Sequence, residues 1–396
     1  LKKLALRLAI NKASNEGWLA EHMFVMGVRG PGDRVTYFTG AFPSMCGKTS
    51  TAMLPGERIV GDDIAYLRKI EGEVRAVNVE NGIFGIIRDV NAEDDPLIWQ
   101  TLTSPGEVIF SNVLVTEEGT SHWQNDGRPV PDGGINHSGP WWPGKEDEAA
   151  NAIGVSHWNA RYTIRLEYLD NYDPRHNDPD GVPVRAVVYG GRDSDTCVPL
   201  TQAFDWAHGI VTMGASLESE TTAATIGGEG VRRFDPMSNL DFISIPIGRY
   251  IEANLNFAGD LPAPPLVFGV NYFLKGPDGA YLNAPRDKKA WLKWMELRVH
   301  DEVGAIQTPV GLIPLYRDLR HIFAEHLGKD YAAEDYVLQF QLRIPEHLAK
   351  MDRIESIYRR QVPDAPAALF ELLQQQRDRL LAARERLGDY VSPFDF

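Results

Sequence analysis

The tripeptide Gly47-Lys48-Thr49 has the composition of a phosphate-binding loop. Residues 35–38 are β-branched and aromatic, residues 40–51 are rich in small side chains, and a helix is expected to begin within the latter stretch. In such an arrangement backbone N–H groups hold phosphate oxygens, the lysine neutralises charge and the threonine hydroxyl can bind magnesium. Phe42 stands where the common pattern has a glycine, so a plain loop entering a helix remains the alternative.

Two adjacent carboxylates, Asp62 and Asp63, follow a short β-branched stretch at 58–61. Neighbouring carboxylates repel each other unless a cation or solvent compensates, and ligand sites of α/β folds form at the carboxyl ends of strands. Beside a phosphate loop they complete the set of groups that metal-assisted phosphoryl transfer uses. For the aspartate pair taken alone, a solvated turn is the alternative.

His22 and Cys46 are two further candidates, each with an ordinary alternative. His22 lies near the start of an expected strand, where it is either a ligand or a packed residue. Cys46 lies inside the phosphate loop, where its thiol pKa could be lowered or where it simply fills space.

The composition limits the class of protein. The chain has 396 residues and is 43% hydrophobic, which is enough for a large core. Its 40 Lys and Arg against 55 Asp and Glu give a net charge of −15 with no basic face, which argues against nucleic-acid binding. Two cysteines, Cys46 and Cys197, make no disulfide framework, and no apolar run approaches the roughly 18 residues of a membrane span. We therefore expect a cytoplasmic protein that binds neither nucleic acid nor a membrane.

The hydrophobic pattern predicts one large α/β domain over residues 1–396. Helices are expected at 3–14, 291–300, in several segments after 314, and as an amphipathic terminal helix within 366–390. Strands are expected at 23–28, 35–38, 58–63 and 186–189, with mainly short strands and turns over 74–115. A long surface loop region is expected at 121–150 and a mobile loop at 214–230.

Longer motifs closely resemble the GTP-dependent phosphoenolpyruvate carboxykinases, and the first three keep that family's mutual spacing without gaps. The motifs are Glu16-Gly17-Trp18-Leu19-Ala20-Glu21-His22-Met23, Ala41-Phe42-Pro43-Ser44-Met45-Cys46-Gly47-Lys48-Thr49, Gly61-Asp62-Asp63-Ile64-Ala65, Glu80-Asn81-Gly82-Ile83-Phe84-Gly85, Gly190-Gly191-Arg192, Ser219-Glu220-Thr221-Thr222-Ala223-Ala224 and Asn271-Tyr272-Phe273. The resemblance covers at least residues 1–300, and the missing loop glycine is itself a family feature. It implies a mixed-sheet mononucleotide-binding domain with a phosphate-binding loop and C-terminal helices.

The resemblance also implies two metal ions. A catalytic manganese would be held by Lys2, His22 and Asp63, and a nucleotide-bound magnesium by Thr49 and Asp62. Because an amine ligates only when neutral, the pKa of Lys2 would have to lie well below its ordinary value.

The remaining site residues follow from the same resemblance. Catalytic roles fall on Cys46, Lys48, Arg161 and Arg192. Substrate binding falls on Ser44, Asn159 and Arg161, although the match at Asn159 and Arg161 is short and a strand with an exposed arginine is the alternative. Nucleotide binding falls on Met45, Cys46, Gly47, Lys48, Thr49, Ser50, Arg192, Phe273 and Tyr281. Residues 219–230 match a lid that closes when ligands bind.

The implied reaction is reversible. Oxaloacetate and GTP give phosphoenolpyruvate, carbon dioxide and GDP, a step that feeds gluconeogenesis. The implied partners are these small molecules, and the family suggests a monomer.

The sequence departs from the family pattern in three respects, of which the first two indicate a divergent subgroup. Arg286-Asp287-Lys288-Lys289 stands where the family has a Phe-Gly-x-Asn stretch that contacts guanine, so GTP, ATP and pyrophosphate all remain possible donors. Ile86-Ile87-Arg88-Asp89 replaces a small-residue loop, and Ser50 replaces an asparagine. The chain starts at Leu1 and lacks the family's N-terminal domain, so we expect it to be the C-terminal part of a longer protein.

Two other functions therefore stay open. The chain could be a nucleotide-binding module without turnover, or a small-molecule kinase that uses the same phosphate loop with another acceptor.

Overall fold

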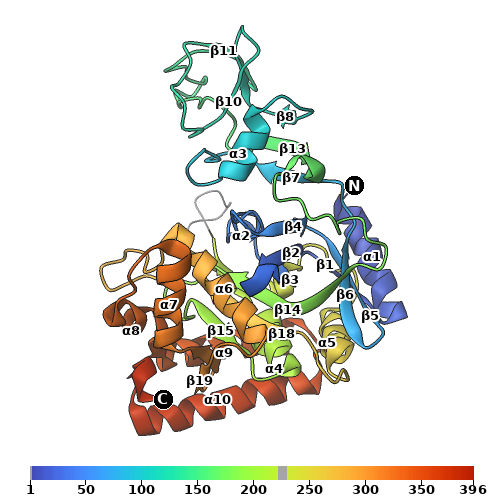
Figure 1. The fold of residues 1–396 in the computed structure, drawn as a ribbon, viewed down its shortest axis with the longest axis vertical. Helices are drawn as coiled ribbons and strands as arrows, with labels where there is room; N and C mark the ends of the chain where they lie inside the picture. Colours follow the sequence, from blue (N-terminus) through green and yellow to red (C-terminus); the bar gives the residue numbers. More distant parts are fainter. Residues whose placement is uncertain (1, 222–229) are drawn as a thin grey trace.

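A mixed sheet lies at the centre of the computed structural model, which describes residues 2–221 and 230–396 (Figure 1). Among the described residues its longest path runs β1-β5-β6-β14-β18-β15-β20-β19, and β3, β2 and β4 branch from β14. Its strands are β1 (Leu19–Glu21), β2 (Phe24–Arg29), β3 (Val35–Ala41), β4 (Arg58–Gly61), β5 (Ala65–Ile70), β6 (Glu73–Asn78), β14 (Val182–Gly191), β15 (Leu200–Gln202), β18 (Leu266–Asn271), β19 (Ala305–Thr308) and β20 (Gly311–Pro314). The predicted α/β class is confirmed.

Helices cover both faces of this sheet (Figure 1). The helices of the described residues are α1 (Lys2–Glu16), α2 (Lys48–Ala52), α3 (Pro96–Thr103), α4 (Trp206–Gly209), α5 (Ile247–Ala258), α6 (Lys288–Val299), α7 (Tyr316–Leu327), α8 (Ala333–Phe340), α9 (Ile344–Gln361) and α10 (Ala367–Leu387). Of these, α3 lies away from the sheet, in a projecting lobe (Figure 1). Successive side chains of β3 point to opposite faces: Tyr37 packs in the core that α1, α5, α9 and α10 cover, and Phe38 in the core that α6 and α7 cover. The sheet is therefore the middle layer of three.

The strand directions gather several loops at one edge of the sheet. β3 and β18 both run parallel to β14, and β4 runs in the same direction as β3 because each is antiparallel to β2. The segments that follow these four strands begin at Phe42, Arg192, Tyr272 and Asp62. The carboxyl ends of parallel strands are where α/β folds place their ligands, so this edge is the expected position of the site.

Residues 82–165 form a lobe that projects beyond this edge (Figure 1). Its strands and those of two small two-stranded sheets elsewhere are β7 (Gly82–Ile86), β8 (Ile109–Ser111), β9 (Leu114–Val115), β10 (Ser121–His122), β11 (Gly134–Asn136), β12 (Gly139–Trp141), β13 (Arg161–Arg165), β16 (Glu218–Glu220), β17 (Arg232–Phe234), β21 (Leu342–Arg343) and β22 (Tyr390–Val391).

The structure corrects two local expectations in the lobe. Residues 121–150 are not simply a loop, because β10, β11 and β12 join β9 in a small sheet with its own core of Leu114, Trp141 and Val155. The stretch over 74–115 also contains α3, which begins at Pro96 and buries Ile98 and Leu102 on one face. Proline at the first helical position and apolar residues four apart were the signals for this helix.

Other segments lie as the sequence indicates. α1 ends before Gly17, whose left-handed φ of 75° suits a helix C-terminus. α10 occupies Ala367–Leu387 within the expected 366–390. Of the expected lid at 219–230, residues 222–229 lie outside the described residues. Across the described part of the chain, no helix is long and apolar enough to cross a membrane.

Candidate active site

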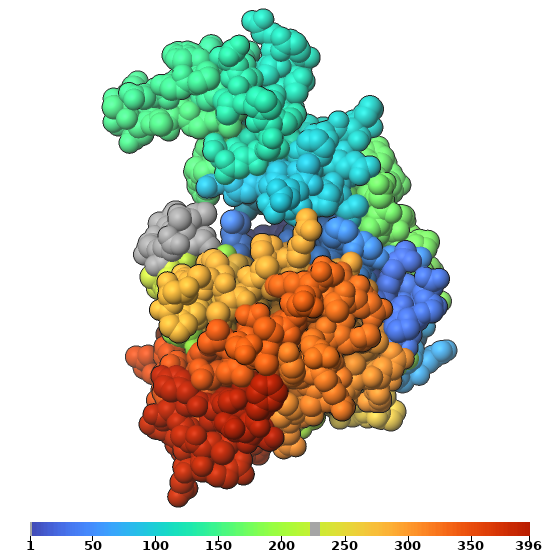
Figure 2. Space-filling model, turned by 60° about the vertical axis from the view of Figure 1, so that its left-hand side comes forward, coloured from blue at the N-terminus to red at the C-terminus, as the bar shows by residue number. Residues whose placement is uncertain are grey.

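A cleft of about 600 Å³ lies between the carboxyl edge of the sheet and the lobe. Figure 2 shows the surface hollowed between the lobe and the body of the molecule. The cleft is lined by residues from the start of α1, from the segments after β3, β4, β14 and β18, and from the base of the lobe. Segments far apart in the sequence therefore meet in one depression.

The phosphate loop takes an irregular path between β3 and α2. Gly47 has a left-handed φ of 97°, and a Cβ atom there would lie 3.1 Å from the ring of Tyr272. Met45 also has a positive φ, of 65°. The close approach and the backbone conformation together explain why glycine precedes Lys48.

Lys48, Lys2, His22 and Asp63 converge at one side of the cleft. The Lys48 Nζ atom lies 2.9 Å from His22 Nε2, and His22 Nε2 lies 2.8 Å from Asp63 Oδ1. Both lysine ammonium groups also contact the Asp63 carboxylate. Burial lowers the pKa of Lys48 to about 7 and lowers the pKa of Lys2 and of His22. Two amines whose pKa is lowered by burial thus contact one carboxylate.

The His22 ring is fixed in one tautomer. Its Nδ1 atom lies 3.0 Å from the backbone carbonyl oxygen of Ser238, which can only accept, so Nδ1 carries the proton. The unprotonated Nε2 then points toward Lys48 and Asp63. This is the orientation in which a histidine coordinates a metal ion.

The chemistry of these donors fits a divalent metal. No three His, Cys, Asp or Glu side chains of the described chain form a metal-binding group, so a metal here would need a lysine amine beside His22 and Asp63. Burial, which lowers the pKa of Lys2, favours the neutral form of that amine. The Oδ1 atom of Asp62 is buried without a hydrogen-bond partner, and its Oδ2 lies 3.4 Å from Thr49 Oγ1. An unpartnered carboxylate oxygen of this kind suits a second cation.

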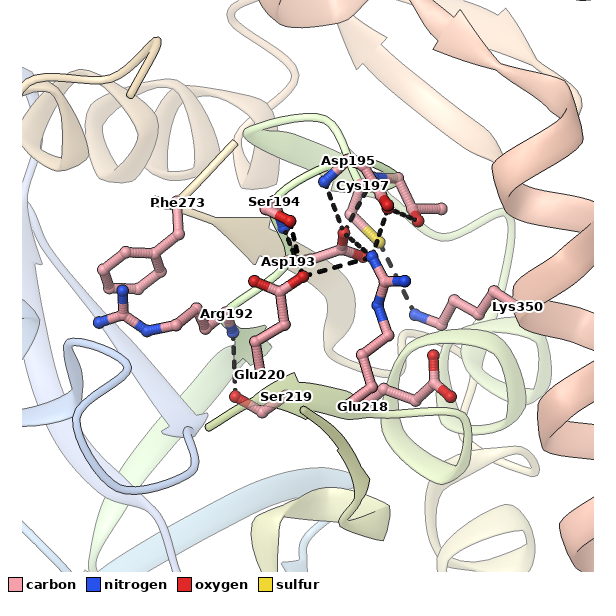
Figure 3. Close-up of polar contacts among 12 residues, drawn as sticks. Arg192, Asp193, Ser194, Asp195, Cys197, Glu218, Ser219, Glu220, Phe273 and Lys350 are labelled. Carbon is pink, nitrogen blue, oxygen red and sulfur yellow. Dashed lines mark hydrogen bonds and ion pairs between the residues drawn. The ribbon is translucent and has the colours of Figure 1, made fainter. Parts of the chain in front are cut away.

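Arg192 lies beside the phosphate loop and points its guanidinium at Phe273 (Figure 3). Its guanidinium stacks 3.6 Å over the ring of Phe273 and donates at 3.1 Å to Tyr281 Oη and to the carbonyl oxygen of Met45. Its backbone N–H donates to Ser219 Oγ at 3.1 Å. The predicted nucleotide-binding residues on three segments are thus in mutual contact.

The structure does not bring every predicted residue into the cleft. The Cys46 side chain is buried off the cleft, 3.0 Å from Ser219 Oγ, and burial raises rather than lowers its pKa. Arg161 lines the cleft, but Asn159 does not: its Oδ1 accepts from Arg161 Nε at 3.0 Å and Nη2 at 2.7 Å. Ser44, Thr49 and Ser50 all line the cleft.

Several cleft residues were missed from the sequence. Tyr272, Asn283, Lys288 and Trp291 line the wall that follows β18. Tyr272 belongs to the motif Asn271-Tyr272-Phe273 and could have been included on that ground. No local pattern marks Asn283 or Trp291, because their position depends on how the chain returns after β18.

Comparisons with known proteins identify the family of the chain. The family model of the phosphoenolpyruvate carboxykinase C-terminal P-loop domain matches residues 18–379. The chain is 57% identical to a phosphoenolpyruvate carboxykinase (GTP) of Thermococcus sibiricus, with 100% of this chain and 64% of the relative aligned. Proteins of the same name from Pyrococcus abyssi and Saccharolobus solfataricus are 57% and 45% identical over 100% of this chain and cover 63% and 64% of those relatives. The chain thus spans somewhat less than two thirds of the length of these relatives.

Proposed function

The chain belongs to the family of the phosphoenolpyruvate carboxykinase C-terminal P-loop domain, and from that premise we propose that it carries the nucleotide- and metal-binding part of such an enzyme. The reaction would be the reversible conversion of oxaloacetate and GTP to phosphoenolpyruvate, carbon dioxide and GDP, as a step of gluconeogenesis. The observation that carries the proposal is the convergence of Lys2, His22 and Asp63 beside Lys48 of the phosphate loop.

Each cluster of the cleft has a role in this proposal. Lys2, His22 and Asp63 would hold manganese, and Thr49 and Asp62 would hold the magnesium of the nucleotide. When bound, the metals supply positive charge that stabilises the enolate and phosphate oxygens. Lys48 would neutralise the charge of the transferring phosphate. Arg192 lies beside the phosphate loop, because its guanidinium donates a hydrogen bond to the carbonyl oxygen of Met45.

The substrate side of the cleft would bind oxaloacetate through its carboxylates. Ser44 and Arg161 line the cleft, and Asn159 orients the Arg161 guanidinium with its Oδ1 atom. An arginine that is held in place loses less side-chain entropy on binding a carboxylate. The cleft walls would also exclude water, which otherwise protonates the enolate. The free thiols Cys46 and Cys197 support a reducing compartment such as the cytoplasm.

The test is phosphoenolpyruvate formation from oxaloacetate by the full-length protein, with GTP, ATP or pyrophosphate as donor and manganese present. We expect GTP to be the best donor and Lys48→Ala and Asp63→Ala each to lower kcat at least 1000-fold, as removal of central catalytic charges does. Lys69→Ala and Asp260→Ala, which break an ion pair outside the cleft, are the matched controls.

Two outcomes would contradict the proposal. No turnover by the full-length protein with any donor would exclude carboxykinase activity, and wild-type rates in Lys48→Ala or Asp63→Ala would exclude this site. Turnover by the full-length protein but not by residues 1–396 would show that this chain alone is a nucleotide-binding module.

A further inference from the structure

Two hydrogen bonds side by side join the segment of His22 to the turn that contains Ser238. His22 Nδ1 donates to the carbonyl oxygen of Ser238 at 3.0 Å, and Asn239 Nδ2 donates to Glu21 Oε2 at 3.0 Å. Consecutive residues of one segment thus bond to consecutive residues of the other. The orientation of the His22 ring is therefore linked to a pair of side chains that do not themselves line the cleft.

The backbone of this turn takes a conformation that needs outside support. Met237 and Ser238 have left-handed φ angles of 52° and 53°. Residues other than glycine rarely adopt this region, and they remain in it only where the surrounding structure fixes them. The direction of the Ser238 carbonyl, and with it the bond to His22, therefore depends on what holds the turn.

Asn239 fixes the end of the turn on both sides. The residue is fully buried, and its Nδ2 also donates to Tyr250 Oη at 2.9 Å, while that hydroxyl donates to the Glu21 carboxylate. The backbone N–H groups of Phe242 and Ile243 donate to the carbonyl oxygen of Asn239 at 2.8 Å and 3.0 Å. The side chain thus ties the turn to Glu21 and to α5, and the carbonyl ties it to the segment that follows.

The same segment contacts a second proposed metal ligand. The ring of Phe242 lies 4.9 Å from the His22 ring, centroid to centroid, and Lys2 Nζ lies 5.9 Å from the centroid of the Phe242 ring. Residues 238–242 therefore lie against two of the three side chains that would hold manganese. A displacement of the turn would disturb the ligands and not only the core.

Asn254 allows positioning to be separated from plain packing. Its Nδ2 donates to Glu21 Oε1 at 3.4 Å and to the backbone carbonyl oxygen of Tyr250 at 3.1 Å. Like Asn239 it is buried against the Glu21 carboxylate, but within the described chain its side chain bonds only to Glu21 and to α5. If the network served stability alone, the two asparagines would be equivalent.

We propose that Asn239 is a positioning residue for the manganese site. Through its bond to Glu21 it holds the turn at Ser238, and the Ser238 carbonyl in turn holds the proton on His22 Nδ1. The unprotonated Nε2 atom of His22 is thereby kept directed at the Asp63 carboxylate. The inference rests on the proposed function, because it extends the metal site of that function to the groups that orient its histidine.

The test measures manganese affinity and ring orientation in Asn239→Ala. Titration of the metal-free full-length protein with Mn²⁺, followed by electron paramagnetic resonance, would give the affinity. We expect Asn239→Ala to weaken Mn²⁺ binding about 10- to 100-fold, the usual effect of losing a group that orients a metal ligand. Crystal structures of the metal-free wild type and variant should show the cause, because only in the variant should the Ser238 carbonyl lie beyond hydrogen-bond distance of His22 Nδ1.

Asn254→Ala is the matched control. It removes the same side chain from the same buried network, so it should lower the thermal midpoint about as much as Asn239→Ala does. Its Mn²⁺ affinity should stay within twofold of wild type, and the bond between His22 and Ser238 should be intact in the crystal.

Glu21 provides an independent pair of variants. Glu21→Gln keeps an acceptor oxygen for Asn239 and should bind Mn²⁺ within about threefold of wild type. Glu21→Leu removes that acceptor and should weaken Mn²⁺ as much as Asn239→Ala does. Because both changes act through one hydrogen bond, the double variant should be no weaker than either single variant.

The contrary results separate the two proposals. Wild-type Mn²⁺ affinity in Asn239→Ala would overturn the role of Asn239 and leave the proposed function in place. An equal loss of affinity in Asn254→Ala would do the same, as would a loss in Asn239→Ala with the bond between His22 and Ser238 unchanged. Wild type that binds Mn²⁺ no more tightly than Asp63→Ala would overturn the proposed metal site together with this inference.

Discussion

Ser219 joins three segments beside the cleft through one hydroxyl group. Its Oγ accepts from the backbone N–H of Arg192 at 3.1 Å (Figure 3). The same Oγ lies 3.0 Å from the Sγ atom of Cys46. The strand that carries it, β16, also bonds to the Arg192 segment, because the N–H of Glu220 donates to the Arg192 carbonyl at 2.9 Å. Ser219 thus ties the phosphate loop to the segment that positions the Arg192 guanidinium.

Replacement of Ser219 by alanine should impair turnover more than folding. The loss of one buried hydrogen-bonding hydroxyl costs on the order of 1 kcal/mol of unfolding free energy. In this variant the Arg192 segment and Cys46 lose their common partner. We therefore expect kcat of the full-length protein to fall about 10-fold, which corresponds to losing the stabilisation that about one hydrogen bond gives the transition state. Cys46 should also react faster with iodoacetamide, since its thiol is no longer held.

Two variants serve as controls for that prediction. Ser219→Thr keeps the hydroxyl and should restore both kcat and the slow thiol reaction. Ser104→Ala, at the exposed end of α3, should change neither. Unchanged kcat and thiol reactivity in Ser219→Ala would show that the hydroxyl does not connect these segments.

At the scale of elements, a buried histidine joins α4 to the terminal helix α10. The N–H of Phe204 donates to His208 Nδ1 at 3.3 Å, so Nε2 carries the proton and donates to Gln376 Oε1 at 3.0 Å. Burial, together with the nearby Arg379, lowers the pKa of His208 to about 4, although Gln376 and Asp205 act in the opposite direction. The contact between the two helices therefore depends on a neutral imidazole.

This contact should make stability depend on pH with a definite sign. The native pKa of about 4 lies below the ordinary value of 6.5, so below pH 6.5 the unfolded chain binds a proton that the native protein does not. The stabilisation is complete above pH 6.5, falls as the pH drops toward 4, and then levels off. Between pH 7 and pH 5 the loss for this single group should be on the order of 2 kcal/mol.

Urea unfolding at pH 7 and pH 5 would measure that loss. His208→Asn should be less stable at pH 7 but should lose less stability on acidification than wild type. His321→Asn, which changes a histidine with a 78% exposed side chain on α7, should keep the pH dependence of wild type. An equal pH dependence in His208→Asn and wild type would contradict the native pKa given above.

At the scale of the whole molecule, the base of the lobe packs on the body in the described part of the chain. Ile83, Ile98, Leu102 and Tyr162 at that base pack in the same core as Trp291 and Trp294 of α6. The outer sheet, β9 to β12, instead packs on the separate small core of Leu114, Trp141 and Val155. So small a core contributes little to the free energy of unfolding of the outer sheet. We therefore expect the outer sheet to open independently of the body.

Trp141→Ala should therefore have a local effect. Removal of a buried tryptophan costs about 3–5 kcal/mol at the site, enough to unfold a unit with so small a core. We expect rapid amide hydrogen exchange over 114–141, with exchange in β3, β14 and β18 and the affinity for GDP unchanged. Trp294→Ala, in the main core, should instead destabilise the whole molecule. Loss of GDP binding in Trp141→Ala would show that the outer sheet supports the cleft.

Much of the site was predictable because it depends on residue type and short spacing. Gly47-Lys48-Thr49 forms a loop between a strand and a helix, and Asp62 and Asp63 follow β4, as the local pattern predicts. The helix α3 and the sheet in 121–150 were missed. The strands of that sheet are only two or three residues long, which is too short to show an alternating pattern.

The sequence by itself determined the family motifs, the α/β class and the phosphate loop, because each rests on contiguous residues. Only the tertiary structure decided which of these groups share a cleft. Lys2, His22 and Asp63 meet because α1, β1 and β4 converge at one edge of the sheet, and Cys46 is turned away from the cleft onto Ser219. The bond of His22 to the Ser238 carbonyl joins residues 216 positions apart, and Asn239 beside it is fully buried. Burial, unlike residue type, is a property of everything packed around a group, so no local pattern could reveal it.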